Sequence, residues 1–149
     1  MLAWDDRAFA QLAVAELYAI AQLRERVFVV EQRCAYLDAD GLDPPSHHLW
    51  ATRDGEVVAY LRVVPPGARF VEPSLGRIVT ASAVRGTGLG RELVRRGIAL
   101  ALALHGDGAI RIAAQAHLER FYGEFGFARA SDVFDEDGIP HVEMIIARA

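Results

Sequence analysis

Three parts of the chain carry patterns that are typical of helices. Apolar positions recur every three or four residues from Val14 to Phe28, which predicts an amphipathic helix there. A run rich in helix-forming residues predicts a second helix from Gly88 to about His105, and a shorter helix is expected over His117 to Phe125. A glycine directly follows each of the last two segments, as is common where a helix ends.

Apolar stretches between these segments predict the strands of a sheet. Leu49 to Arg53 and Glu56 to Val64 are joined by Asp54-Gly55, a strong hairpin signal because this dipeptide tolerates the positive φ angles of a two-residue turn. The segment Gln32 to His47 contains one glycine and two prolines, so a loop with one short helical turn is expected there. Further strands are predicted at Leu75 to Ser82, at Ala109 to Ala114, near Val133 and Phe134, and at His141 to Ala147, the last two flanking a second turn at Asp137-Gly138.

The order of these elements predicts an α/β (α+β) fold. A helix, three strands, a helix, a strand, a helix and two strands follow one another, which indicates a mixed, mostly antiparallel sheet with helices on both faces. The unit from Leu75 to Ala114 should form a central parallel β-α-β crossover of the usual right-handed kind. No repeat or linker divides the sequence, so residues 1–149 are expected to form a single domain.

Composition narrows the class of protein. The 149 residues are 52% hydrophobic with a net charge of −4, which is typical of a globular protein and unfavourable for general nucleic-acid binding. No apolar run is long enough to span a membrane, and the N-terminus lacks the pattern of a signal peptide. The single cysteine, Cys34, excludes an internal disulfide, and the histidines show no metal-ligand spacing. A cytoplasmic monomer or homodimer is expected, without nucleic-acid, membrane or metal partners.

The most informative short segment is Arg85-Gly-Thr-Gly-Leu-Gly90, which lies at the start of the second predicted helix. Three glycines within five positions leave the backbone bare, and the start of a helix directs free N–H groups and a positive dipole end at one point. This arrangement favours a phosphate group. The segment lacks the Lys-Ser/Thr end of a P-loop and lacks glycine at the last position of a dinucleotide fingerprint, so its spacing excludes both of those sites.

A second segment, Tyr122-Gly-Glu-Phe-Gly-Phe127, follows this loop after one predicted helix and one predicted strand. Together the two segments resemble the GNAT family of N-acetyltransferases. The loop is similar to that family's Gln/Arg-x-x-Gly-x-Gly/Ala pyrophosphate motif, and the second segment is similar to its Tyr-x-x-x-Gly-Phe ending. Leu23 to Gln32 and Asp135 to His141 also resemble the ElaA-type branch, so that the resemblance covers almost the whole chain.

The resemblance implies a GNAT-type fold and transfer of an acetyl group from acetyl-CoA, by direct attack within a ternary complex. The acceptor would be a primary amine of a small molecule or a peptide. Backbone N–H groups from Gly86 to Arg91 would bind the pyrophosphate, and the strand before them would pair with the pantetheine amides. The implied cofactor-binding residues are Val79, Thr80, Arg85, Gly86, Thr87, Gly88, Leu89, Gly90, Arg91, Gln115 and Tyr122.

Tyr122 stands where the family places its general acid. The resemblance therefore implies that its phenol protonates or stabilises the departing CoA thiolate. Without the Gly126-Phe127 pair that follows, the same residue would be interpreted as a core tyrosine beside Phe121 and Phe125. Gln115 takes a position where the family often has asparagine, and its side chain is expected either to bind the cofactor arm or to cap the following helix.

The acceptor amine must lose a proton, so a base is required. Glu31 follows four apolar residues at the end of the first predicted helix, where a carboxylate is unfavourable for the helix dipole. It is predicted to be the base and to bind the amine, with an ion pair to Arg77 as the equal alternative. His47 and His48 are weaker candidates, because alternation along a strand turns only one of them inward. Phe28, His47 and Arg77 complete the predicted substrate-binding set.

Three carboxylates lie close together in the loop after the first helix. Asp38, Asp40 and Asp43 lack the order of ligands that an EF-hand requires. A solvated acidic loop, or one that attracts a cationic substrate, is therefore expected there.

Two alternative functions follow from the same residues. Leu23 to Val30 also resembles acyl-homoserine-lactone synthases, which have the same fold and use acyl carriers but lack so regular a glycine loop. A non-enzymatic CoA-binding sensor would keep the loop and would have no need of Tyr122.

Overall fold

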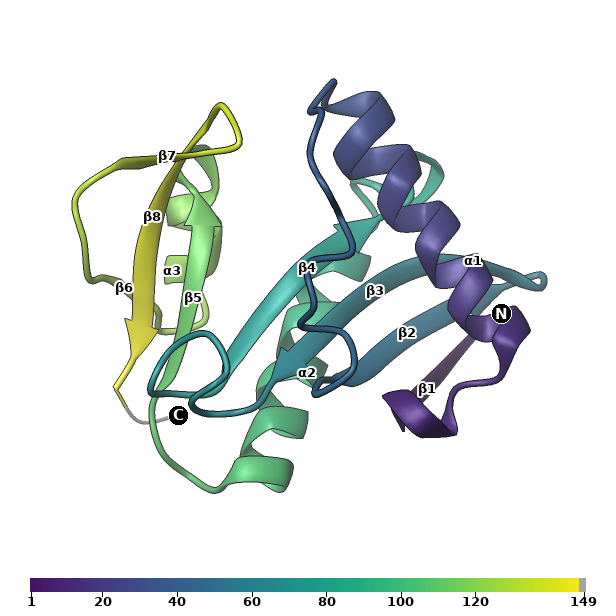
Figure 1. Ribbon diagram of the computed structural model, residues 1–149, viewed down its shortest axis with the longest axis horizontal. Coiled ribbons are helices and arrows are strands. Elements are labelled where there is room, and N and C mark those ends of the chain that lie inside the picture. Colours follow the sequence, from purple (N-terminus) through teal and green to yellow (C-terminus); the bar gives the residue numbers. More distant parts are fainter. Residues whose placement is uncertain (148–149) are drawn as a thin grey trace.

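The computed structural model describes residues 1–147, and within them two antiparallel sheets lie next to each other (Figure 1). The first sheet has the order β1-β2-β3-β4, and the second has the order β5-β8-β6 with β7 paired to β8. The strands of the first sheet are β1 (Leu2–Ala8), β2 (His47–Arg53), β3 (Glu56–Val64) and β4 (Ser74–Thr80). Those of the second sheet are β5 (Ile110–Gln115), β6 (Ala128–Arg129), β7 (Phe134–Glu136) and β8 (Ile139–Ile146).

Helices cover both faces of the first sheet, as predicted. The α-helices are α1 (Val14–Arg24), α2 (Leu89–His105) and α3 (Glu119–Gly123). Successive side chains of a strand point to opposite faces, so Tyr60 packs in the cluster on the α1 side, while Leu61 packs in the main core with α2. The α1 cluster also contains Ile20 and Trp50. The main core continues from α2 into the second sheet and α3.

The chain passes from β4 through α2 to β5, which is the predicted crossover. At the start of the two strands, the Arg111 N–H donates a hydrogen bond to the Pro73 carbonyl over 3.1 Å. The strands then diverge toward their C-terminal ends and form no ladder with each other (Figure 1). The predicted sheet is thus divided in two between β4 and β5, and the divergence leaves the facing edge of β4 without a strand partner.

A β-bulge in β4 accompanies this divergence. Tyr60 and Arg62 of β3 are paired with Val79 and Gly76, so β4 contains one residue more than the matching part of β3. Arg77 lies in the bulge and has a positive φ of 50°. Because a bulge bends its strand and increases the local twist, it turns the end of β4 away from β5.

The structure differs from the predicted elements in four places. The edge strands β1 and β6 are not evident from the sequence, because β1 has no buried residue and contains three consecutive charged residues, and β6 has only two residues. Beyond α1, a π-helical stretch, Glu25–Glu31, extends the first helix three residues past its predicted end. The loop from Gln32 toward β2 contains turns and bends but no helical turn.

Two Asp-Gly dipeptides form tight turns. Asp54 and Gly55 have φ angles of 51° and 80°, which confirms the predicted hairpin between β2 and β3. Asp137 and Gly138 have φ angles of 54° and 81° and join β7 to β8. The second turn brings β7 and the start of β8 beside the end of β5.

Replacing Gly97 with valine is expected to lower the free energy of unfolding by about 1–3 kcal/mol. A Cβ atom at Gly97 would lie 2.5 Å from Leu61 Cδ2 and 3.3 Å from Leu75 Cδ1, because α2 packs closely on the sheet there. Urea unfolding measures the change. Gly123→Val on α3 is the control, since a Cβ atom there meets no atom within 4 Å. An equal loss for both variants would show that helix propensity, and not packing on the sheet, determines the effect.

Candidate active site

The glycine loop has the conformation that a phosphate site requires. Gly86 and Gly88 have φ angles of 80° and 86°, which L side chains rarely adopt, and no atom lies within 4 Å of a Cβ built at either position. Gly88 is the N-cap residue of α2. The first N–H groups of the helix have no partner within the helix, so they remain available to an anion in front of the loop.

A cavity of about 440 Å³ lies beside this loop, and we call it the loop cavity. Thr87 and Leu89 lie outside its lining: the Thr87 hydroxyl donates to the Val84 carbonyl, and the Leu89 side chain is buried in the main core. Of the residues predicted to bind the cofactor, the lining includes Val79, Thr80, Arg85, Gly86, Gly88, Gly90, Arg91 and Tyr122.

A second cavity lies between the diverging strands, and we call it the β4–β5 cavity. Its walls include residues of both strands, of the π-helical stretch and of the β7–β8 turn. Four predicted site residues contribute to its lining: Phe28, Arg77, Gln115 and Tyr122. The β4–β5 cavity is therefore the candidate place for the acceptor.

Tyr122 lines both cavities. Its ring is 6% exposed and packs edge-on against Phe121, with ring centres 5.1 Å apart, and against Phe127. The hydroxyl group makes no hydrogen bond to any residue in the described range 1–147. Burial raises the pKa of the Tyr122 phenol far above its ordinary value, so the group is protonated at neutral pH. A protonated donor without a protein partner thus lies at the junction of the two cavities.

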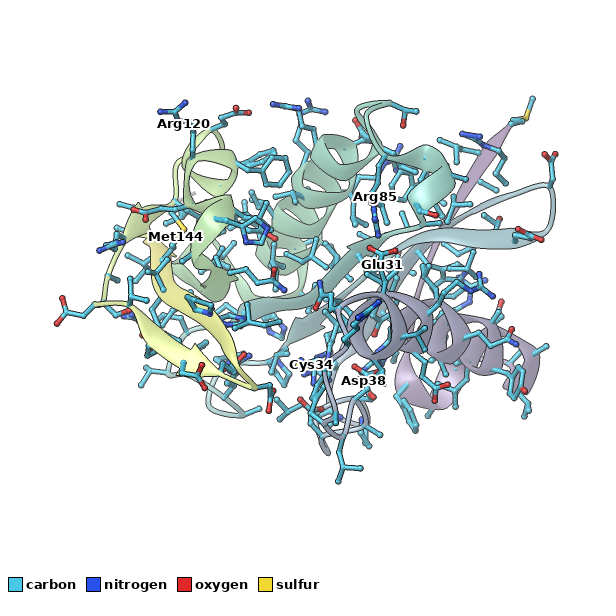
Figure 2. The ribbon with its side chains drawn as sticks, turned by 90° about the horizontal axis from the view of Figure 1, so that it is seen from above. Glu31, Cys34, Asp38, Arg85, Arg120 and Met144 are labelled. Carbon is cyan, nitrogen blue, oxygen red and sulfur yellow. The ribbon has the colours of Figure 1, made fainter. Side chains whose placement is uncertain are left out.

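Glu31 forms an ion pair with the glycine loop. Its carboxylate accepts a hydrogen bond from Arg85 Nη1 over 2.6 Å, and Arg85 Nη2 donates to the Thr80 carbonyl over 3.3 Å (Figure 2). The Glu31 and Arg85 side chains are each about 40% exposed. The predicted alternative partner, Arg77, instead binds Asp38. Glu31 therefore lies at the rim between the helix end and the loop, and its ion pair is not buried.

Arg91, which follows the loop, is held on the other side of the loop cavity. Its guanidinium group forms an ion pair with Glu124 at 2.9 Å and lies 5.6 Å above the centre of the Phe121 ring. This contact links the first turn of α2 to the segment that carries Tyr122.

Gln115 directs its side chain into the β4–β5 cavity. It makes no capping hydrogen bond to the short helical turn that follows, so the capping alternative is wrong. Its Nε2 group lies 3.5 Å from Gln32 Oε1, at the limit of a hydrogen bond, and both side chains line the cavity.

The acidic loop is neither solvated nor free to attract a cation. Asp38, Asp40 and Asp43 face inward, where they bind arginine side chains from α1, β3 and β4. Arg62 is fully buried; its Nη2 donates to Asp40 over 2.6 Å and its Nη1 donates to Asp43 over 2.8 Å. The remaining ion pairs join Arg24 to Asp38 and Asp43, and Arg77 to Asp38 and Asp40.

These ion pairs determine the charge of the acidic side chains. Burial alone would raise the pKa of Asp40, but the hydrogen bond and positive charge of Arg62 outweigh it and hold the pKa well below its ordinary value. The pKa of Asp43 is also lowered, because Arg24 and Arg62 outweigh the effect of burial. Both carboxylates are therefore ionised and neutralised within the protein.

The two histidines at the start of β2 point to opposite faces, as alternation predicts. His48 is the buried one; Tyr60 hydroxyl lies 2.7 Å from its Nδ1, its Nε2–H donates to the Asp43 carbonyl, and burial lowers its pKa. His47 lies on the opposite face, where its Nε2 is 2.7 Å from Asp6. Neither ring lines the loop cavity or the β4–β5 cavity.

Several residues that line the β4–β5 cavity carry no local sequence signal. Cys34 is buried, and its thiol donates to the Asp137 carbonyl over 2.9 Å, which joins the loop after α1 to the β7–β8 turn (Figure 2). The Tyr36 hydroxyl donates to Asp38, and burial raises the Tyr36 pKa to about 12. His141, at the start of β8, also contributes to the lining. These residues can be identified only from the tertiary structure, which brings the loop after α1, the two diverging strands and the start of β8 to one cavity.

Two kinds of feature are missing from residues 1–147. No three His, Cys, Asp or Glu side chains there are grouped so that they could hold a metal ion. None of the helices in this part of the chain is both long and apolar enough to cross a membrane.

Comparison with known proteins agrees with this geometry. The family described as acetyltransferase (GNAT) domain matches residues 17–148. The ElaA protein of Escherichia coli is 38% identical over 97% of this chain and 95% of its own length, and a UPF0039 protein of Synechocystis is 45% identical over 95% and 93%. A solved structure of an acyl-CoA N-acyltransferase from Pseudomonas aeruginosa has a TM-score of 0.94 and 45% identity, covering 99% of this chain and all of that one.

The E. coli ElaA crystal structure has a TM-score of 0.91, with 37% identity over 97% of this chain and 99% of that one. These similarities extend over both sheets and over the helices between them, so they include the glycine loop and the segment with Tyr122. The fold supports acyl transfer from an acyl-CoA. The chain belongs to the GNAT family of acetyltransferases, in the branch that contains the ElaA and UPF0039 proteins.

Proposed function

We propose that the protein is an N-acetyltransferase that transfers the acetyl group of acetyl-CoA to a primary amine of a small molecule or a peptide. One observation carries this proposal: Tyr122 lines both the loop cavity and the β4–β5 cavity. A donor thioester that enters from the loop side and an amine that enters between the strands would meet at its hydroxyl group. Direct transfer within a ternary complex requires such a junction.

The two cavities together would provide groups for the pyrophosphate and the pantetheine arm of the cofactor. N–H groups from Gly86 to Arg91 would bind the pyrophosphate at the start of α2. The edge of β4 that faces β5 has no strand partner within residues 1–147. At Val79 and Thr80, this edge would pair with the pantetheine amides as it would with an added strand. On the opposite strand, the Gln115 side chain would hydrogen-bond the end of the same arm.

The proposed reaction exchanges one bond for another without a covalent enzyme intermediate. The amine lone pair attacks the thioester carbonyl carbon, and the carbonyl π electrons move to its oxygen. When the carbonyl re-forms, the C–S bond breaks and its electron pair stays on sulfur. The Tyr122 hydroxyl group donates its proton to that thiolate, and the proton that the nitrogen loses returns to the phenolate through water, so the products are an amide and CoA with a free thiol.

On the acceptor side, Phe28 and Arg77 would form walls of the amine site. Glu31 would attract the positively charged amine toward the rim of the cavities, in competition with its ion pair to Arg85. The His47 ring binds Asp6 and lies away from both cavities. It would therefore contact only a substrate long enough to extend around the edge of the sheet.

Release of free thiol from acetyl-CoA tests the proposed activity. The panel of acceptors contains small aliphatic and aromatic amines, amino acids, peptide N-termini and lysine peptides. Product mass should increase by one acetyl group on nitrogen. Thermal stabilisation by acetyl-CoA without turnover of any acceptor would contradict the enzymatic proposal and would fit a CoA-binding sensor. Preference for a longer acyl-CoA would contradict only the identity of the donor.

Gly88→Val is expected to abolish the thermal stabilisation by acetyl-CoA. A side chain at Gly88 would both oppose the positive φ of 86° and cover the N–H groups that face the ligand. Gly106→Val at the other end of α2 is the matched control, because Gly106 has a φ of 88° and an equally open surrounding. It should weaken folding but retain the response to acetyl-CoA. Undiminished binding by folded Gly88→Val would refute the pyrophosphate site.

A further inference from the structure

His141 is the one histidine whose ring lies against the β4–β5 cavity among residues 1–147. It stands at the start of β8, directly opposite Gln115 at the end of β5, so the two side chains lie on the same face of the second sheet. The residue is 8% exposed, and its ring stacks on Phe134 with the ring centres 6.0 Å apart. The imidazole is therefore held in a fixed orientation at the candidate acceptor site.

The surroundings of the ring determine which nitrogen carries the proton. His141 Nδ1 lies 2.7 Å from the Ile139 carbonyl oxygen. A carbonyl oxygen only accepts, so Nδ1 must carry the hydrogen atom. In the neutral ring Nε2 is therefore left with a free lone pair, which is the form that a base requires.

A carboxylate lies beside this nitrogen. Glu136 Oε2 is 3.6 Å from His141 Nε2, too far for a hydrogen bond but close enough to stabilise a positive charge on the ring. The other oxygen of Glu136 accepts a hydrogen bond from Arg69 over 2.9 Å, which fixes the position of the carboxylate. The imidazole is thus held between the Ile139 carbonyl and the Glu136 carboxylate.

The other candidate bases are less suitably placed. Glu31 is bound to Arg85 and is absent from the lining of the β4–β5 cavity. His48 has both nitrogens occupied, and burial lowers its pKa. His47 lies outside the cavity, beside Asp6.

We propose that His141 is the general base that accepts the proton of the attacking amine, directly or through one water molecule. This inference rests on the proposed acetyltransferase function. The nitrogen–carbon bond forms with the amine lone pair, and the N–H bond leaves its electrons on nitrogen as the proton moves to His141 Nε2. Sulfur leaves with the C–S pair and takes the Tyr122 proton, and the imidazolium proton then returns to the Tyr122 phenolate through water. An amine that arrives as an ammonium ion first gives one further proton to His141 Nε2, which passes it to solvent before the attack.

The test compares two nucleophiles in the same enzyme. The first is the primary amine from the acceptor panel with the highest turnover, which is largely an ammonium ion near neutral pH. The second is hydroxylamine, which is largely neutral there and has less need of a base. His141→Ala should lower kcat/KM for the primary amine about a hundred-fold, but only a few-fold for hydroxylamine. Added imidazole should restore part of the lost activity.

Three controls make the outcomes distinct. The thermal shift with acetyl-CoA should be the same in His141→Ala and the unaltered protein, and His141→Gln provides a second variant if the alanine variant folds poorly. Glu31→Gln should lower kcat/KM mainly for the primary amine, whose positive charge the carboxylate attracts, and added imidazole should restore none of this loss. Equal losses for both nucleophiles in His141→Ala, or restoration of Glu31→Gln activity by imidazole, would overturn the role of His141 while the acetyltransferase function stands. Absence of turnover by the unaltered protein with every amine would overturn both.

Discussion

Tyr122→Phe is expected to lower kcat about a hundred-fold or more and to leave the affinity for acetyl-CoA almost unchanged. The phenylalanine ring keeps the edge-on contacts with Phe121 and Phe127, so the walls of both cavities retain their shape. The substitution removes only the hydroxyl group. Because this group makes no hydrogen bond within residues 1–147, its loss removes no interaction that stabilises the fold. Steady-state kinetics and a binding titration on the same sample separate the two quantities.

The control for this prediction is a neighbouring aromatic residue. Phe121→Leu also changes the wall of the loop cavity but removes no proton donor, so it should alter KM for acetyl-CoA more than kcat. If Tyr122→Phe lowers affinity and kcat by the same factor, the tyrosine binds the cofactor and does not act as the acid. If it changes neither quantity, the residue is only a core tyrosine.

Arg62→Met is expected to lower the free energy of unfolding by about 3–5 kcal/mol. Methionine fills much of the same space, but Asp40 and Asp43 would lose the guanidinium group that neutralises them inside the protein. Removing one partner of a buried network leaves an uncompensated charge, which costs more than the ion pair contributed. Urea unfolding followed by fluorescence measures the difference.

Arg95→Met is the matched control, because Arg95 forms an ion pair with Glu92 on the exposed face of α2. This substitution should change the free energy of unfolding by less than about 1 kcal/mol. Similar losses for the two variants would mean that burial of the network contributes nothing beyond an ordinary surface ion pair.

The destabilisation of Arg62→Met should also depend on pH. Asp40 and Asp43 have lowered pKa values in the folded protein, so their stabilisation is complete above the ordinary aspartate pKa of about 3.9 and is lost as the pH falls below it. The variant lacks much of this stabilisation at any pH. The gap in unfolding free energy between the two proteins should therefore narrow in acid, and a gap that stays constant would contradict this assignment.

The buried network connects stability to the candidate site. Asp38, Asp40 and Asp43 fasten the loop after the π-helical stretch onto the sheet, and this loop carries Cys34 and Tyr36 to the β4–β5 cavity. Partial loosening of the loop is expected to alter the acceptor side before the loop cavity. In Arg62→Met, KM for the amine should consequently change more than KM for acetyl-CoA.

Much of the fold could be predicted from the sequence, because apolar periodicity and turn residues act locally. Three helices, the Asp54-Gly55 hairpin and the crossover to Ala114 are present close to their predicted bounds. β1 could not be predicted from local apolar periodicity. This edge strand carries charged residues and is stabilised by its pairing with β2. The split between β4 and β5 depends on a bulge whose position no residue pattern reveals.

The residues Arg85 to Gly90 determine by themselves that a glycine-rich helix start with a bare backbone is present, because consecutive backbone groups form it, and they predict a phosphate site there. Together with the segment from Tyr122, they also indicate the GNAT family. Contacts between distant segments are decided only by the tertiary structure. It pairs Glu31 with Arg85 and the acidic loop with Arg62, and it brings His141 to the β4–β5 cavity. The partner of a charged side chain depends on which elements pack together, and that information lies outside any short stretch of sequence.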